Sequence, residues 1–262
     1  MTSKDGTTIG YDTRGAGPAL ILVDGATGFR SQGYSNELAD LLAPDFTVYS
    51  YDRRGRGESG DTQPFAIERE IEDIEALIDA AGGAAYVYGI SSGGALALEA
   101  AIRLQGKVKK LALYEIPYDA SKEGIAAWHT YRAKLSELLA AGQRGDAIAL
   151  FMSFVGVPED MMAGMRQSPM WAPLEGIAPT LAYDAAALGA DRVPPTERAA
   201  EVTAQTLVMD GSASLAYMPF MRASAEALTK AIPNAQHQVV EGQSHDVDAK
   251  VLAPILAAFL RQ

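Results

Sequence analysis

A short apolar segment, residues 84–88, leads directly into the sequence Gly89-Ile90-Ser91-Ser92-Gly93-Gly94, and a helix-forming segment follows at residues 95–102. This order of strand, Gly-x-Ser-x-Gly and helix predicts a turn so sharp that its two flanking glycines must leave space for the strand and the helix to pack. Ser91 is then held at a strained, exposed point at the end of a strand. Backbone N–H groups at the start of the helix face any negative charge that develops there. The alternative is an ordinary Gly/Ser turn.

Strand-like and helix-like segments alternate along most of the chain. This alternation predicts the α/β class, with a mostly parallel sheet and helices on both of its faces. Strands are expected at residues 7–11, 19–23, 46–51, 84–88, 110–114, 206–209 and 238–240, and helices at 67–81, 95–102, 218–231 and 251–260. Between residues 118 and 198 only helical segments separated by Gly and Pro occur. We therefore expect a core of residues 1–117 and 199–262, with an inserted helical cap at 118–198.

The three histidines of the chain limit the choice of a catalytic base. A serine hydroxyl is a weak nucleophile until a base takes its proton. His245 lies in the loop after the last predicted strand, at the edge where sites in open α/β sheets assemble. His129 in the predicted cap and His237 beside the last strand are expected to pack or to face solvent. His245 is the predicted base, because the order serine, acid, histidine then holds along the chain.

Residues 51–59 contain a D-x-x-G-x-G-x-S pattern formed by Asp52, Gly55, Gly57 and Ser59. Together with the turn around Ser91 and the late His245, this segment resembles the α/β-hydrolase superfamily over nearly the whole chain. The resemblance implies an α/β-hydrolase fold with an eight-stranded sheet, a lid and a Ser–acid–His triad.

The acid is the point at which this chain departs from the common pattern of that family. Most members carry an Asp in a G-x-x-D segment after the penultimate strand, but here Ser214 stands in that place, three residues after Gly211. A serine cannot supply the negative charge that stabilises an imidazolium. Glu115 closes the strand at residues 110–114, a position from which some members, including zearalenone lactonases and a group of haloalkane dehalogenases, take their acid. Glu115 is the predicted acid, and Asp210 is the alternative.

An oxyanion hole needs two N–H donors. Ser92, directly after the nucleophile, is expected to supply one. The resemblance places the second at Ala26, in the loop after the strand at residues 19–23. In that loop Asp24 replaces the usual histidine, as in zearalenone lactonases, and is either a partner for a substrate hydroxyl or a turn residue. Gly25 is expected to lie beside the substrate.

Three aromatic side chains of the predicted cap, Trp128, Trp171 and Tyr183, are candidates for lining a substrate pocket, with packing inside the cap as the alternative. Dehalogenases and epoxide hydrolases of the superfamily that the chain resembles carry an Asp at the position of Ser91, so the resemblance argues against both activities. A serine nucleophile favours acyl transfer to water. The sequence therefore predicts a cofactor-free esterase or lactonase that acts on a small to medium apolar molecule. C–C hydrolysis or perhydrolysis on the same scaffold, and a non-hydrolytic small-molecule receptor, are the alternatives.

The amino-acid composition limits the binding partners and the cellular location that we expect for this protein. With 22 basic and 33 acidic residues the net charge is −11, which disfavours nucleic acid and anionic membranes as partners. The arginines of residues 51–59 are therefore expected to be solvated or ion-paired rather than phosphate-binding. The absence of cysteine and the lack of an apolar N-terminal segment favour a cytoplasmic location, and no metal site is expected from three scattered histidines. Monomer and homodimer are both left open.

Overall fold

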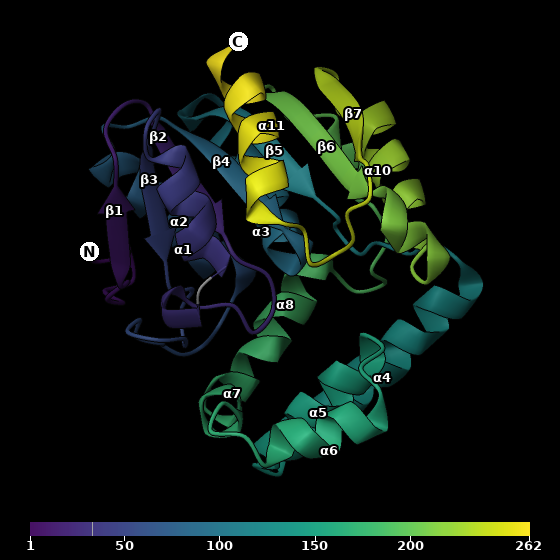
Figure 1. Cartoon of the computed structure of the whole chain (residues 1–262). Helices are drawn as coiled ribbons and strands as arrows, with labels where there is room; N and C mark the ends of the chain where they lie inside the picture. The colour runs from purple at the N-terminus through teal and green to yellow at the C-terminus, as the bar shows by residue number, and fades with distance from the viewer. Residues whose placement is uncertain (33) are drawn as a thin grey trace.

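The computed structural model describes residues 1–32 and 34–262, and a seven-stranded sheet lies at its centre (Figure 1). The strand order is β1-β3-β2-β4-β5-β6-β7, and every neighbouring pair is parallel except β1 and β3, which are antiparallel. The strands are β1 (Tyr11–Arg14), β2 (Ala19–Val23), β3 (Thr47–Tyr51), β4 (Ala85–Ile90), β5 (Val108–Tyr114), β6 (Gln205–Gly211) and β7 (Ala235–Val240).

The prediction of eight strands is wrong by one. The first predicted strand, at residues 7–11, is also displaced, because β1 begins only at Tyr11. A tight turn at Gly6, with φ +87°, brings Thr8 back onto Thr2 as an isolated bridge. The N-terminal residues are therefore closed into a short loop, which pairs with itself instead of extending the edge of the sheet.

Helices cover both faces of the sheet, as predicted. The alternating side chains of β2 show the two layers, because Leu20 and Leu22 pack on one face and Ile21 and Val23 on the other. The first face is covered by α1 (Tyr34–Leu42) and α11 (Ala249–Arg261), and the second by α2 (Ile67–Ala80), α3 (Ser91–Leu104) and α10 (Phe220–Ala231). The sequence reasoning did not identify α1.

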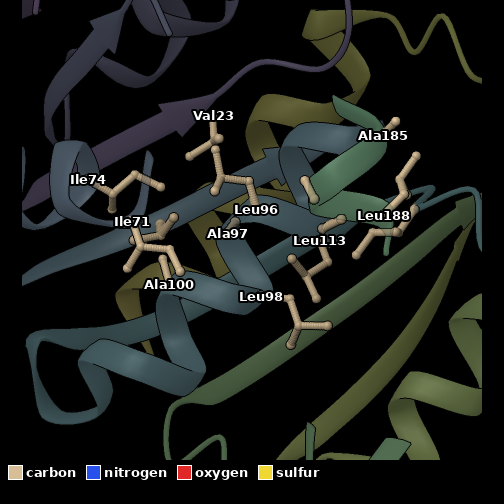
Figure 2. Close-up of a cluster of buried hydrophobic side chains, with 14 of the residues drawn as sticks. Val23, Ile71, Ile74, Leu96, Ala97, Leu98, Ala100, Leu113, Ala185 and Leu188 are labelled. Atoms are coloured by element: carbon tan, nitrogen blue, oxygen red, sulfur yellow. The ribbon is translucent and has the colours of Figure 1, made fainter. Parts of the chain in front are cut away.

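The helix that follows β4 lies at the centre of the second layer. Figure 2 shows Leu96 of α3 close to Val23 of the sheet, in the same buried cluster as Ile71 and Ile74 of α2. These side chains are buried, and burial of each aliphatic side chain contributes about 1.5–3 kcal/mol. The packing fixes α3, and with it the turn at its first residue.

Between β5 and β6 the described chain forms helices and connecting turns. They are α4 (Lys122–Ala140), α5 (Arg144–Phe154), α6 (Glu159–Arg166), α7 (Trp171–Ile177), α8 (Leu181–Leu188) and α9 (Thr196–Ala199). In Figure 1, α4 to α7 lie beyond one end of the sheet, and α8 leads back toward α3. Ala185 and Leu188 of α8 share a buried cluster with Leu98 of α3 (Figure 2). In the part of the chain that the structure describes, no helix is long and apolar enough to cross a membrane.

Candidate active site

Ser91 is the first residue of α3 and has a φ of 56°, in the left-handed region that non-glycine residues rarely adopt. The glycines of the motif make this turn possible. A Cβ on Gly89 would lie 2.6 Å from the carbonyl oxygen of Gly93, and one on Gly93 would overlap the carbonyl oxygen of Val23. The sharp strand–turn–helix geometry predicted from the motif is therefore present.

Glu115 and His245 are brought together from residues 130 apart in sequence. His245 Nδ1 lies 2.9 Å from Glu115 Oε2, and the backbone N–H of Gly211 donates to Glu115 Oε1 at 2.8 Å. The Glu115 side chain is buried, whereas that of His245 is 30% exposed. Because a carboxylate only accepts hydrogen bonds, this pair places the imidazole proton on Nδ1 and leaves Nε2 as an acceptor.

The loop that carries His245 is fixed by its neighbours. The hydroxyl of Tyr114 donates to the carbonyl oxygen of Ser244 at 2.6 Å, and the N–H of Ala213 donates to that of Gln243 at 2.9 Å. These bonds tie the loop after β7 to the ends of β5 and β6. Ser91 Oγ makes no hydrogen bond to a described residue. A hydrogen bond between Ser91 and His245 is therefore not observed, and it is part of the reaction proposed below.

The alternative acid, Asp210, is engaged elsewhere. Its carboxylate lies 2.5 Å from His237 Nε2 and accepts a 2.6 Å hydrogen bond from Arg222 Nε. Its side chain is almost fully buried in this arrangement. The geometry thus favours Glu115 over Asp210 as the partner of His245. His129 is exposed on α4, where it pairs with Asp191.

The loop after β2 lies directly against Ser91. A Cβ on Gly25 would lie 2.9 Å from Ser91 Cβ and 3.5 Å from Ser91 Oγ, so a larger residue would crowd the serine. Ala26, the predicted second oxyanion donor, follows in this loop. The carboxylate of Asp24 accepts a hydrogen bond from Ser35 at the start of α1. Burial raises the pKa of Asp24, against the opposing effects of the Ser35 hydrogen bond and of the positive charges nearby.

The arginines of residues 51–59 are buried and ion-paired. Arg54 forms two 2.8 Å hydrogen bonds with Asp73. Arg53 and Arg56 bind Asp184, a buried residue of α8, at 2.5 and 2.6 Å. Burial acts to raise the pKa of Asp184, but the charges of Arg56 and Arg53 and a hydrogen bond from Ser92 hold that pKa below its usual value.

Sequence reasoning missed Asp184. The helical segment around residue 184 carries no motif, and in a chain with 33 acidic residues nothing distinguishes this one carboxylate from the others. The available signal was indirect: three arginines close together at residues 53–56 require anionic partners if their loop is buried.

The predicted pocket aromatics have partners within the protein. Trp128 Nε1 donates to the carbonyl oxygen of Gly189 at 3.0 Å, and Trp171 Nε1 donates to Glu175 at 2.9 Å. The Tyr183 ring stacks on Phe65, with centroids 3.7 Å apart. These contacts fit the packing interpretation, and a substrate role for the three side chains stays a prediction. Over residues 1–32 and 34–262, His, Asp and Glu side chains form no group of three that could hold a metal ion.

Ser91 lies in a strained turn after β4 of an α/β sheet, and Glu115 and His245 pair beyond the ends of β5 and β7. These features define the class of α/β hydrolases, and comparison with known proteins agrees with this class. The chain belongs to the Alpha/beta hydrolase family, whose model matches residues 17–253. The family and the fold class predicted from the sequence are thereby confirmed.

Individual relatives support the same assignment. The chain is similar to a crystal structure of an alpha/beta hydrolase from Sphaerobacter thermophilus, with 47% identity, a TM-score of 0.88 and 99% of each chain covered. A thermophilic esterase from Thermogutta terrifontis shares the fold, with 24% identity and a TM-score of 0.72 over 99% of this chain and 96% of that one. The uncharacterized hydrolase YraK of Bacillus subtilis is 32% identical over 114 residues, which make up 42% of this chain and 41% of YraK. The matched segment therefore spans about two-fifths of that relative's length.

Proposed function

We propose that this protein is a serine hydrolase that cleaves a carboxylic ester or lactone of a small to medium apolar molecule through an acyl-enzyme. The observation that carries the proposal is the Glu115–His245 pair, in which a buried carboxylate holds Nδ1 of a partly exposed imidazole. A base oriented in this way suits a serine nucleophile, and Ser91 lies in the strained turn at the same edge of the sheet.

In the proposed reaction, Ser91 Oγ attacks the ester carbonyl while His245 Nε2 takes the serine proton. His245 then gives this proton to the leaving alcohol, and the acyl group stays on Ser91. Next, His245 takes a proton from water, whose oxygen attacks the acyl carbon. His245 then returns this proton to Ser91 Oγ as the bond to the acyl group breaks and the acid is released. The N–H groups of Ser92 and Ala26 stabilise the oxyanion in both steps, where loss of one donor costs about 10²–10³ in rate.

We further propose that the helices between β5 and β6 act as the cap over this site, with residues 118–198 as its bounds. The packing of α8 against α3, whose first residue is Ser91, supports this role. The buried apolar side chains of these helices are consistent with an apolar substrate.

A fluorophosphonate probe and short p-nitrophenyl esters test the function together. We expect the probe to label Ser91 and the esters to be hydrolysed, and Ser91→Ala to abolish both. Ser214→Ala, which removes a buried serine hydroxyl in the short 3-10 helix after β6, is the matched control and should retain both. Turnover or labelling that survives in Ser91→Ala, or tight ligand binding by a wild-type protein with neither activity, would contradict the proposal.

A further inference from the structure

Asp184 connects α8 to both sides of the proposed oxyanion hole. Its Oδ1 accepts hydrogen bonds from Ser92 Oγ at 2.8 Å and from Arg53 Nη1 at 2.5 Å, and its Oδ2 accepts one from Arg56 Nη2 at 2.6 Å. The Asp184 side chain is 5% exposed, and the two guanidinium groups are buried more deeply still. Hydrogen bonds between charged groups in such surroundings are strong and directional.

The Arg56 bond sets the orientation of one proposed oxyanion donor. Arg56 Nη1 donates to the carbonyl oxygen of Gly25 at 2.6 Å and to that of Gly28 at 3.3 Å. The Gly25 carbonyl and the Ala26 N–H belong to the same peptide unit, which is planar and trans. With the carbonyl directed at Arg56, the Ala26 N–H must point to the opposite side.

The Ser92 bond sets the position of the other proposed donor. Ser92 directly follows the nucleophile, and its N–H is the oxyanion donor of the α3 side. Its side chain is buried and donates to the same carboxylate that holds Arg56. One carboxyl group therefore fixes the two backbone segments that must converge on the oxyanion.

Charge balance makes Asp184 essential to this arrangement. Arg53 also binds Glu70 through two hydrogen bonds of 2.7 and 2.8 Å, so it keeps an anionic partner without Asp184. For Arg56, within the described ranges, Asp184 is the one carboxylate at ion-pair distance. Loss of the Asp184 charge would leave Arg56 buried and unpaired, which favours its movement away from Gly25.

We propose that Asp184 is a positioning residue that aligns both oxyanion N–H groups, so that the oxyanion hole is complete only when α8 is packed against α3. Figure 2 shows this packing, in which Ala185 and Leu188 lie beside α3. The inference rests on the proposed serine hydrolase function, and it adds that the helices between β5 and β6 contribute to the chemical step as well as to substrate binding.

Two variants test it, and a third is the control. Ser92→Ala removes one hydrogen bond from a neutral hydroxyl to the Asp184 carboxylate and keeps the Ser92 backbone N–H. Asp184→Asn removes the charge that holds Arg56. Asp73→Asn disrupts a similarly buried pair between Asp73 of α2 and Arg54 of the same loop. Among the described residues, Arg54 donates hydrogen bonds to Asp73, Asp5 and the Arg69 carbonyl oxygen, and to neither Ser92 nor the loop after β2.

The readouts are kcat and KM for a short p-nitrophenyl ester, the inhibition constant of a short alkyl trifluoromethyl ketone, and thermal unfolding. The ketone forms a tetrahedral adduct with the serine and so reports on the oxyanion hole. We expect kcat to fall about tenfold in Ser92→Ala. In Asp184→Asn it should fall by up to about a hundredfold, the cost of losing one oxyanion donor, and KM should change little in either variant. The inhibition constant should rise by the same factors. Asp73→Asn should lower the unfolding temperature and keep all three kinetic constants within about twofold.

The inference is overturned if Ser92→Ala matches the wild type, or if Asp184→Asn loses no more kcat than Asp73→Asn. It is also overturned if kcat falls while the ketone binds unchanged. If Asp184→Asn does not fold, Ser92→Ala alone decides. A wild-type protein that neither hydrolyses esters nor reacts with a fluorophosphonate would instead remove the proposed function, and the inference with it.

Discussion

Replacing Glu115 with Gln tests the assignment of the acid, because it keeps the shape of the side chain and removes its charge. The Gly211 N–H donates to Oε1, which determines the oxygen that faces His245. In the variant the Gln carbonyl takes the Gly211 bond, and its NH₂ group then lies where Oε2 was, 2.9 Å from Nδ1. Two donors cannot share that contact, so the imidazole proton moves from Nδ1 to Nε2. A histidine protonated at Nε2 cannot accept the proton of Ser91.

We therefore expect Glu115→Gln to lower kcat by about 10⁴, the cost of the corresponding Asp-to-Asn change in a serine protease triad. At 1.36 kcal/mol for each factor of ten, this loss amounts to about 5.4 kcal/mol of transition-state stabilisation. The assay is kcat and KM for a short p-nitrophenyl ester, with thermal unfolding measured in parallel.

Asp210→Asn is the matched control, because Asp210 is equally buried but pairs with His237 and Arg222. It should lower the unfolding temperature and leave kcat within about threefold of the wild type, since that carboxylate has no bond to His245. The reasoning is refuted if folded Glu115→Gln keeps more than about a tenth of the wild-type kcat. Equal losses in the two variants would refute it as well.

Three further changes probe the turn, the loop and the core. Gly93→Ala places a methyl group on the carbonyl oxygen of Val23, and we expect it to cost at least about 1–3 kcal/mol and most of the activity, measured by urea unfolding and ester turnover. Burial raises the folded pKa of Asp24, so the contribution of this group to stability should be lost as pH rises from the unfolded value near 3.8 through the folded one. The free energy of unfolding of Asp24→Asn relative to the wild type should therefore rise with pH in urea titrations above about pH 4, and a difference that does not change with pH would contradict the shift. Ile74→Ala should cost about 2–5 kcal/mol in urea unfolding with kcat unchanged, and a loss below about 1 kcal/mol would mean that α2 is not packed as in Figure 2.

The sequence predicts the elements of this fold well where their patterns are local. The apolar segment at residues 19–23 coincides with β2, and the predicted helix at residues 67–81 ends one residue beyond α2. The glycine pair after α2 explains this accuracy, because both Gly82 and Gly83 have a positive φ and end the helix.

The sequence-based predictions fail where strand pairing or the burial of charged side chains decides the structure. The eighth strand was implied by the resemblance alone, and no segment of the sequence predicted it. The strand predicted at residues 7–11 is displaced because the bridge between Thr2 and Thr8 depends on a turn that no periodicity reveals. Asp184 is a comparable case, since nothing in its own helix shows that two arginines from the loop after β3 will bind it. A search for the partners of clustered arginines would have narrowed the choice to the acidic residues of neighbouring helices, without selecting one of them.

Two residues of the candidate site, Ser91 and Glu115, are among the five non-glycine residues of the described chain that have a positive φ. Ser91 has a φ of 56° and Glu115 a φ of 44°, and each residue directly follows a parallel strand, β4 and β5. Such conformations cost about 1–3 kcal/mol each, so the surrounding packing must over-determine them. At Ser91 the close contact of α3 with β4 does this, and at Glu115 it is done by hydrogen bonds from its own N–H to the Met209 carbonyl and from the Gly211 N–H to its carboxylate. The strain is thus held at two neighbouring strand ends by the sheet itself.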